Sequence, residues 1–167
     1  VPKGDLVKVQ KLLLGRGYQQ SEQLSINDQC EKSHHLIPFL NENAIMIEIH
    51  WTLSRHILDQ DKAFINGLWE RSKPCEIAGE NVSILSPEDI ILYLCIHNSF
   101  HHFFVLWLKA FCDFVETVKH YHDKIEWKKI LLYAKSWNMI RCVYITLYFV
   151  SDLMEVSIPD RVLSRLK

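Results

Sequence analysis

The chain has 167 residues, of which 49% are hydrophobic and 23% are charged, a composition typical of a globular protein with one domain or two small ones. Its formal net charge of −1 gives no electrostatic basis for a nucleic-acid-binding surface. Five glycines and five prolines are too few for a loop-rich or disordered chain.

Hydrophobic residues recur at helical spacing over residues 4–15, which predicts an N-terminal helix. Gly15 and Gly17 are expected to end this helix, because glycine is favoured at helix C-termini. The stretch 21–33 is polar and predicts a loop.

A β-hairpin is predicted next. Residues 35–40 form a short extended run, in which Pro38 indicates an edge strand or an irregular one. Residues 41–43 (NEN) have the composition of a turn. Residues 44–52 alternate between two kinds of side chain with a period of two, which predicts the returning strand.

The rest of the chain is predicted to be mainly helical. A helix is expected over 55–71 and a second small hairpin near 75–84. Ser86 and Pro87 form a strong helix start, because serine caps helices and proline suits the first helical position. The helices that follow are expected at 87–101, 104–121, 126–136, 139–154 and 159–166.

These elements predict an α+β fold in two parts. The first part, residues 1–54, would be a partial α/β sheet built from a helix plus a β-hairpin. The second part, residues 55–167, would be a mainly helical C-terminal bundle with a small hairpin near 75–84.

The cysteines and the apolar runs indicate a cytoplasmic protein without a membrane partner. The five cysteines include no CxxC pair, so reduced thiols are expected. The longest apolar runs, near 90–96 and 103–108, are too short to span a bilayer. The chain opens with the charged sequence VPKGD, which is not a signal peptide.

Glu48 and His50 are the first candidates for chemistry. The predicted strand has one apolar face, and both residues lie on the other face, with Cα atoms about 7 Å apart. A carboxylate that projects from a strand beside other acids can hold a divalent metal ion. The alternative is that Glu48 faces solvent or pairs with a lysine.

The second candidate group lies in the segment CIHNSFHHFF. His97 and His101 are spaced i, i+4 and share one helix face, and Asp113 follows on the next predicted helix. Two histidines and an acid could bind zinc or act in phosphate chemistry. Apolar neighbours favour the alternative, which is histidines that form hydrogen bonds across a helix pair or contact a substrate.

Other motifs are absent or uninformative. The sequence has no glycine-rich phosphate loop and no GxSxG, which leaves P-loop and hydrolase-elbow chemistry without support. Four further histidines flank loops and are expected at the surface: His34, His35, His120 and His122.

The order of the motifs carries more information than any one of them. The chain runs through PKGDLVKVQKLLLGRGY, HHLIPF, IEIHWTL, ILSPEDIILYLCIHNSFHH, LKAFCDF and IEWKKILLYAKSWN. This order resembles the uncharacterised nucleotidyltransferase family of the polymerase-β-like superfamily over nearly the whole chain. Residues 1–54 would then be the remainder of the catalytic domain of a bacterial-type nucleotidyltransferase.

The resemblance implies a metal-dependent transfer of a nucleoside monophosphate from an NTP to an acceptor that the sequence does not identify. Such enzymes hold Mg²⁺ with three carboxylates, an Asp-x-Asp pair and a third acid on a neighbouring strand. Glu48 matches the third acid, as a catalytic residue and metal ligand. His50 lies beside it, and His97, His101 and Asp113 match family positions that are candidates for substrate contact.

The start of the chain departs from the family pattern. The Asp-x-Asp strand should precede the first helix, and the chain starts at Val1, where that strand would end. We therefore expect a fragment that lacks two of the three metal ligands and is inactive as it stands. A fragment without part of its sheet would expose an edge, so self-association is also expected.

Two other functions stay open at this point. The parent protein could be a degenerate, non-catalytic member of the family that acts as a binding or regulatory module. Alternatively, the helical part could be a metal-dependent phosphohydrolase that uses His97, His101, His102 and Asp113.

Overall fold

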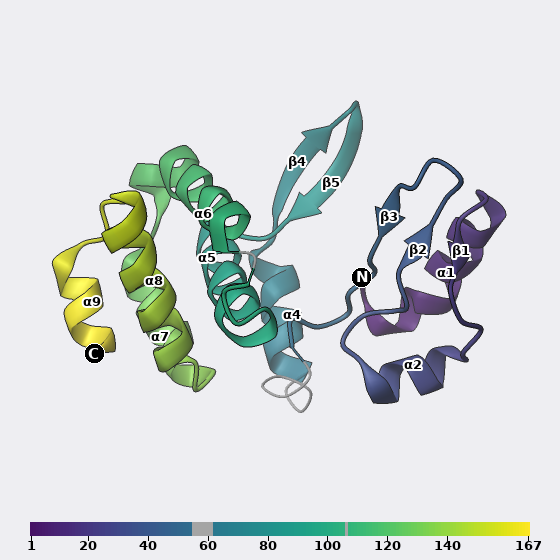
Figure 1. Cartoon of the computed structure of the whole chain (residues 1–167), viewed down its shortest axis with the longest axis horizontal. Helices are drawn as coiled ribbons and strands as arrows, with labels where there is room; N and C mark the ends of the chain where they lie inside the picture. Colours follow the sequence, from purple (N-terminus) through teal and green to yellow (C-terminus); the bar gives the residue numbers. More distant parts are fainter. Residues whose placement is uncertain (55–61, 106) are drawn as a thin grey trace. The chain divides into compact units, whose positions relative to one another are not determined.

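The computed structural model describes residues 1–54, 62–105 and 107–167 (Figure 1). The chain divides into two compact units, Val1–Gln60 and Asp61–Lys167. We refer to them as the N-terminal unit and the helical unit, and each is described by itself.

The N-terminal unit begins with a single 3-10 turn, Lys3–Asp5, that leads into helix α1 (Leu6–Gly15). The predicted helix at 4–15 is confirmed. After the helix ends, Gly17 has a φ of +85°, a left-handed conformation that glycine adopts without steric cost. Gly15 is therefore the last residue of the helix, and Gly17 turns the chain out of it, as the sequence predicts.

The predicted loop over 21–33 is wrong, because Ile26–Lys32 form helix α2. Ser25 caps this helix, and its Oγ accepts a hydrogen bond of 3.1 Å from the Asp28 amide. Gln29 points inward and is only 2% exposed. A polar residue at the inward position breaks the hydrophobic pattern by which a helix is recognised in a sequence.

The Gln29 side chain ties α2 to the chain on both sides of it. Its Nε2 donates to the Leu24 carbonyl at 2.9 Å, and its Oε1 accepts from the Ile37 amide at 2.8 Å. Both backbone groups lie outside regular secondary structure, so the buried amide provides partners that a strand or helix would otherwise supply.

Three short strands form an antiparallel sheet in the order β1 (Gln19–Gln20), β2 (Phe39–Leu40) and β3 (Met46–Ile47). The predicted hairpin is confirmed as the β2–β3 pair, and β1 is a strand that the sequence analysis did not predict. Each strand is shorter than expected, although an isolated bridge between His35 and His50 continues the pairing.

The turn between β2 and β3 is held by the side chain of Asn41. Its Oδ1 accepts hydrogen bonds from the amides of Asn43 and Ile45, at 3.0 and 2.9 Å, and Ala44 has a left-handed φ of 58°. The predicted turn is therefore confirmed. Because backbone amides of residues 43 and 45 bond to Asn41 within the turn, they do not pair in the sheet, and β3 is shorter than expected.

One side of the sheet packs on the core of the N-terminal unit. Leu6, Leu36, Phe39 and Trp51 form the buried cluster, and Ile47 and Ile49 of the β3 segment pack against it. The predicted apolar face of the strand is therefore confirmed from Ile47 to Trp51, whereas Ile45 is 53% exposed.

The helical unit contains α4 (Lys62–Arg71), β4 (Lys73–Ile77), β5 (Glu80–Ile84), α5 (Pro87–Ile96), α6 (Trp107–Tyr121), α7 (Trp127–Ser136), α8 (Ile140–Met154) and α9 (Asp160–Leu166). Helix α5 packs against α6, α7 and α8, and α9 packs against α7 and α8 (Figure 1). Strands β4 and β5 pair along their whole length as an antiparallel hairpin.

Most predictions for this unit are confirmed. The small hairpin and the helices after Ser86 lie close to the predicted ranges. Positions 55–61 of the first predicted helix and position 106 of the third lie outside the described residues. Overall, the predicted α+β class with a helical C-terminal part is confirmed.

Among the described residues, no helix combines the length and the hydrophobicity that a membrane span requires.

The N-terminus of α5 joins the elements of the helical unit. Ser86 accepts a hydrogen bond from the Asp89 amide, which confirms the predicted helix cap. The Asp89 carboxylate is fully buried and receives two hydrogen bonds of 2.9 Å from the Arg71 guanidinium. Arg71 also stacks over the Tyr133 ring, with its Cζ 4.5 Å from the centroid.

This pairing changes the acid–base behaviour of Arg71. Burial opposes its positive charge, but the hydrogen bonds and the negative charge of Asp89 outweigh burial and raise the pKa of the guanidinium. The planar guanidinium donates one hydrogen bond to each oxygen of the buried carboxylate, so neither oxygen needs a water molecule as a partner. The Arg71–Asp89 pair therefore fixes α4 against α5.

The predicted helix over 87–101 changes geometry partway. From His97 to His101 the backbone forms a single π-helical turn, and Phe103 and Phe104 then adopt left-handed φ values of 45° and 60°. π-Helical turns are rare in proteins overall, and many of those that occur lie at functional sites. A left-handed backbone at two bulky residues is also rare.

Candidate functional site

The register of the sheet defines two faces in the N-terminal unit. Gln20 pairs with Phe39 and Phe39 with Ile47, and these three side chains are buried or half-buried on the core side. Their neighbours Gln19, Leu40 and Met46 are also in register and are exposed. We call this second side the open face of the sheet.

Glu48 and His50 extend the open face beyond β3. Since Met46 lies on that face, the period of two places Glu48 and then His50 on it. His50 Nε2 lies 3.3 Å from Glu48 Oε2, and the two side chains are 29% and 41% exposed, respectively. The carboxylate is therefore accessible to water while one of its oxygens contacts an imidazole.

Two more histidines meet His50 at this end of the sheet. The ring centroids of His34, His35 and His50 are 4.8, 5.3 and 5.1 Å apart. His35 Nδ1 lies 2.7 Å from the Leu36 carbonyl, a contact that requires the Nδ1–H tautomer because the carbonyl can only accept. We call His34, His35 and His50 the imidazole cluster.

The imidazole cluster was not predicted from the sequence. His34 and His35 were expected at the surface, and they are half-buried. The signal that could have revealed the cluster is the hairpin register. Leu36 N donates to Ile49 O at 2.9 Å, which sets the HH pair of one strand beside His50 of the other.

The first residue of the chain contacts the same segment. The Val1 backbone nitrogen donates to the His50 carbonyl at 2.8 Å. The backbone at His50 therefore has contacts on two sides, with His35 in the sheet and with Val1.

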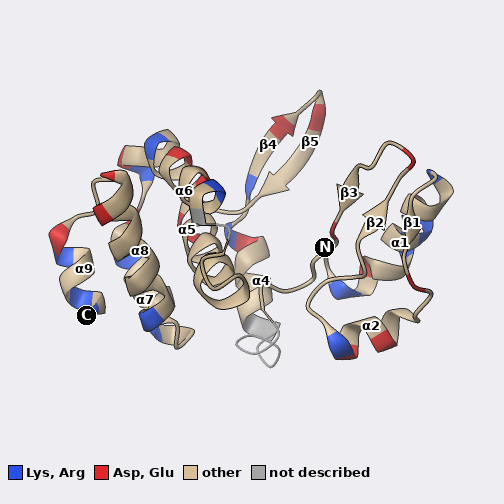
Figure 2. Ribbon diagram, in the orientation of Figure 1, with Lys and Arg blue, Asp and Glu red and all other residues tan. Residues whose placement is uncertain are grey.

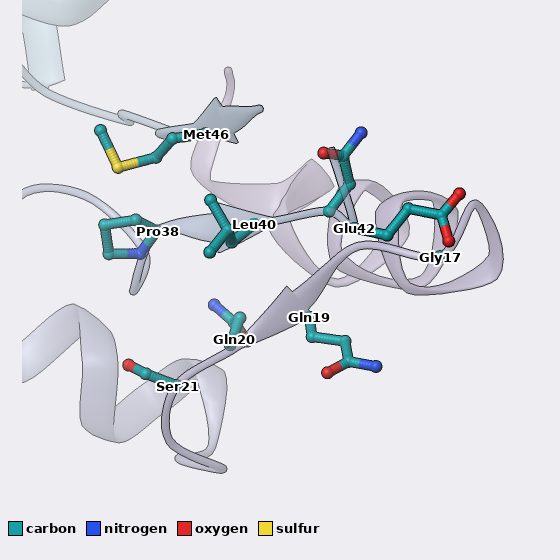
Figure 3. Close-up of a pocket in the computed structure, with 9 residues that line it drawn as sticks. Gly17, Gln19, Gln20, Ser21, Pro38, Leu40, Glu42 and Met46 are labelled. Carbon is teal, nitrogen blue, oxygen red and sulfur yellow. The ribbon is translucent and has the colours of Figure 1, made fainter. Parts of the chain in front are cut away.

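A hollow of about 640 Å³ lies on the open face, at the Met46 end of the segment that carries Glu48 (Figure 3). Pro38, Leu40 and Met46 supply apolar surface, and the β1 segment contributes Gln19, Gln20 and Ser21. Gly17, Asn41 and Glu42 complete the lining. We call this site the open-face hollow.

Glu48 fits a divalent cation such as Mg²⁺ in its chemistry but supplies only one carboxylate. Oxygen ligands suit Mg²⁺, which is often held by one or two carboxylates together with substrate phosphates. Over residues 1–54, 62–105 and 107–167, no group of three or more His, Cys, Asp or Glu side chains is arranged to hold a metal ion.

The candidates in the helical unit are partly brought together. The His97 ring stacks on Tyr93 with centroids 5.2 Å apart, and it lies 4.4 Å from the His102 ring and 6.1 Å from the His101 ring. These rings surround the π-helical turn, so the predicted proximity of His97 and His101 on one face is observed.

Asp113 lies on α6 and has a different partner. Its Oδ2 lies 3.1 Å from Lys109 Nζ, and both side chains are more than half exposed. The hypothesis of a metal-dependent phosphohydrolase required Asp113 and the histidines to share a metal, and no such ligand group occurs in the described parts of the chain.

A second hollow, of about 660 Å³, lies in the helical unit between the β4–β5 hairpin and the helices. Acidic and basic side chains both line it, and they are interspersed over this unit (Figure 2). Arg71 is paired with Asp89, and Lys129 is paired with Glu126. The mixed and internally paired charges give no preference for an anionic or a cationic ligand.

Comparison with known proteins gives one finding about the family. The model of a family described as "uncharacterised nucleotidyltransferase" matches residues 1–155, a range that includes all five predicted site residues. No curated protein and no solved structure matches the chain. The family match confirms the resemblance that the order of motifs indicated.

Proposed function

Because the chain belongs to the uncharacterised nucleotidyltransferase family, we propose that it is the part of a metal-dependent enzyme that binds an NTP and an acceptor. The acceptor would form a bond to the α-phosphorus of the NTP while the bond between the α- and β-phosphates breaks, so that the nucleoside monophosphate is transferred and pyrophosphate is released. The observation that carries the proposal is the position of Glu48, an accessible carboxylate on the open face of a sheet whose other face is core.

Glu48 would be a ligand of Mg²⁺. When bound, Mg²⁺ would neutralise charge that develops on the transferred phosphoryl group. The protein's own contribution would be to hold the carboxylate in place, since Glu48 lies on the segment that follows β3 and its Oε2 contacts His50. His50 would thus position Glu48 and would also contact substrate.

The histidines of the helical unit would contact the acceptor or the nucleotide. His97 and His101 lie on the π-helical turn, where stacked rings provide flat surfaces and ring nitrogens. Asp113 would join them only if a ligand replaced its exposed ion pair with Lys109, which costs little because such pairs contribute about 0–1 kcal/mol.

The chain by itself would be inactive, because Glu48 is one of the three carboxylates that the reaction requires. The reaction would need two further carboxylates near Glu48, which is the part of the site that this chain supplies. The alternative proposal is a non-catalytic member of the family that uses the same surfaces to bind a partner.

The first experiment measures metal binding at Glu48 without requiring activity. Mn²⁺ can replace Mg²⁺ as a paramagnetic probe, and we expect it to broaden the backbone amide NMR signals around Glu48 in the 167-residue chain. Glu48→Gln should remove this broadening, because a neutral amide is a poor ligand for a hard cation. Glu31→Gln, an exposed acid on α2, is the matched control and should leave the broadening unchanged.

The second experiment measures turnover in an extended chain that also carries the other two carboxylates. With Mg²⁺ and NTPs labelled at the α-phosphate, the extended chain should label an acceptor, and Glu48→Gln should reduce the rate about 10³-fold, or about 4 kcal/mol. Turnover by the 167-residue chain alone would contradict its proposed inactivity. Mn²⁺ binding that does not depend on Glu48 would overturn the metal-ligand role.

A further inference from the structure

We propose that the open-face hollow binds the nucleobase of the NTP. This inference rests on the proposed function, because it assigns one part of the same substrate to a site next to Glu48. It goes beyond that function by stating where the base lies and which side chains contact it.

The position of the hollow relative to Glu48 is the first argument. Met46 lines the hollow and precedes Glu48 by two residues on the same face of the β3 segment, so their Cα atoms are about 7 Å apart. A ribose can bridge a distance of this size between a base and the phosphates. A base in the hollow would therefore place its phosphates toward Glu48 and the imidazole cluster.

The charge of the lining is the second argument. Among the residues that the structure describes, no lysine, arginine or histidine lines the hollow, and the one charged side chain in its lining is the acid Glu42. A triphosphate in the hollow would have no cation as partner and would be repelled by Glu42. The hollow thus suits the neutral part of a nucleotide, while the histidines lie at the other end of the Glu48 segment.

The side chains match a flat heterocycle with polar edges. Leu40 and Met46 are 50% and 61% exposed, although they are large hydrophobic residues, and burying them under an aromatic ring would be favourable. Gln19 carries an amide that can both donate and accept hydrogen bonds at the edge of a base. Figure 3 shows Leu40 of β2 between Met46 of β3 and Gln19 of β1.

Hydrogen bonds hold the elements around the hollow in place without a ligand. The Gln20 side chain, on the core side of the sheet, holds β1 in place through hydrogen bonds with Gln10 at 2.9 Å and with the Ile37 carbonyl at 2.7 Å. The Asn41 side chain is held in place by the hydrogen bonds that its Oδ1 accepts from two backbone amides of the turn. The volume of about 640 Å³ lies within the range of roughly 300–1,000 Å³ for small-molecule sites.

The test uses free nucleosides, which have no phosphate and need no metal ion. Adenosine, guanosine, cytidine and uridine are titrated into the 167-residue chain in EDTA, and amide chemical shifts are followed by NMR. We expect at least one nucleoside to shift the signals of Gln19, Leu40 and Met46. Leu40→Ala and Met46→Ala should each weaken binding about fivefold, because each removes about 1 kcal/mol of apolar contact.

Val7→Ala is the matched control, because Val7 is a 49% exposed hydrophobic residue of the same unit that does not line the hollow. It should leave nucleoside binding unchanged. The inference is overturned if no nucleoside binds at millimolar concentration, if the shifts map away from the hollow, or if both alanine variants bind like the wild type.

The outcome can be separated from that of the proposed function. If nucleosides bind in the hollow but Mn²⁺ binding does not depend on Glu48, the base site stands and the metal-ligand role fails. If Glu48-dependent Mn²⁺ binding is seen but no nucleoside reaches the hollow, the metal-ligand role stands and the base site is wrong.

Discussion

The two units place their carboxylates in opposite ways. In the helical unit, Asp89 is fully buried and accepts two hydrogen bonds from Arg71. In the N-terminal unit, the side chain of Glu48 is 41% exposed, and its Oε2 lies 3.3 Å from His50 Nε2. The contrast teaches that a paired, buried acid serves stability, whereas an accessible acid on a sheet face is available for chemistry.

The units also differ in how their cores are built. Helix α5 of the helical unit packs against α6, α7 and α8. The N-terminal unit relies on one cluster, Leu6, Leu36, Phe39 and Trp51, beneath strands of two residues each. We therefore expect the N-terminal unit to depend on single side chains more strongly, and the following variants test this difference.

The largest effect is expected for Phe39→Ala. Phe39 is fully buried, and its removal should lower the free energy of unfolding of the N-terminal unit by about 3–5 kcal/mol through lost contacts and a cavity. Hydrogen exchange with mass spectrometry can follow the two units separately. Residues 1–54 should lose protection while residues 107–167 keep it.

Leu40→Ala is the neighbouring control, because Leu40 is half exposed and should change stability by less than about 0.5 kcal/mol. Equal loss of protection in both units of the Phe39→Ala variant would show that the units do not fold independently, and the comparison would then fail.

The next effect is expected for Asp89→Ala in the helical unit. The variant leaves Arg71 without its bidentate partner, but the Arg71 side chain is 27% exposed and water can partly replace the carboxylate. We therefore expect a loss of about 2–3 kcal/mol, at or below the low end of the range for breaking buried pairs. Chemical denaturation measures this loss.

Asp113→Ala sharpens the same comparison, because it removes an exposed ion pair of the same unit and should cost less than about 0.5 kcal/mol. If Asp89→Ala is no more destabilising than Asp113→Ala, the buried pair has no special role in joining α4 to α5.

The smallest effect on stability is expected for Glu48→Gln. The side chain is exposed and its contact with His50 is long, so the free energy of unfolding should change by less than about 0.5 kcal/mol. Thermal unfolding of the wild type and the variant measures the difference. A loss above about 1 kcal/mol would mean that Glu48 stabilises the fold. A reduced Mn²⁺ affinity of the Glu48→Gln variant would then not show that Glu48 is a metal ligand.

Local signals predicted most of the fold. Ser86 and Pro87 marked the start of α5, and Gly17 marked the end of α1, because each residue acts on its own backbone. Helix α2 was missed because its inward residue is Gln29, which is buried through hydrogen bonds to backbone groups of the segments on either side of the helix. A pattern of hydrophobic residues cannot show a position whose burial depends on such partners.

The candidate site was predicted in part for the same reason. The alternation around Glu48 is local, and its open face could be read from the sequence. The imidazole cluster depends on the register of the hairpin, which the Asn41 turn and the left-handed Ala44 set. The open-face hollow depends in addition on β1, whose two residues, Gln19 and Gln20, show no strand signal.

The exposed side chains of the open face have a consequence for evolution. Gln19, Leu40 and Met46 contribute little to the buried cluster, so replacing them leaves the fold almost unaffected. Mutations there meet weak selection for stability, whereas those at Phe39 meet strong selection. A lineage can therefore sample many ligand preferences on this face by single substitutions, with the scaffold beneath it held constant.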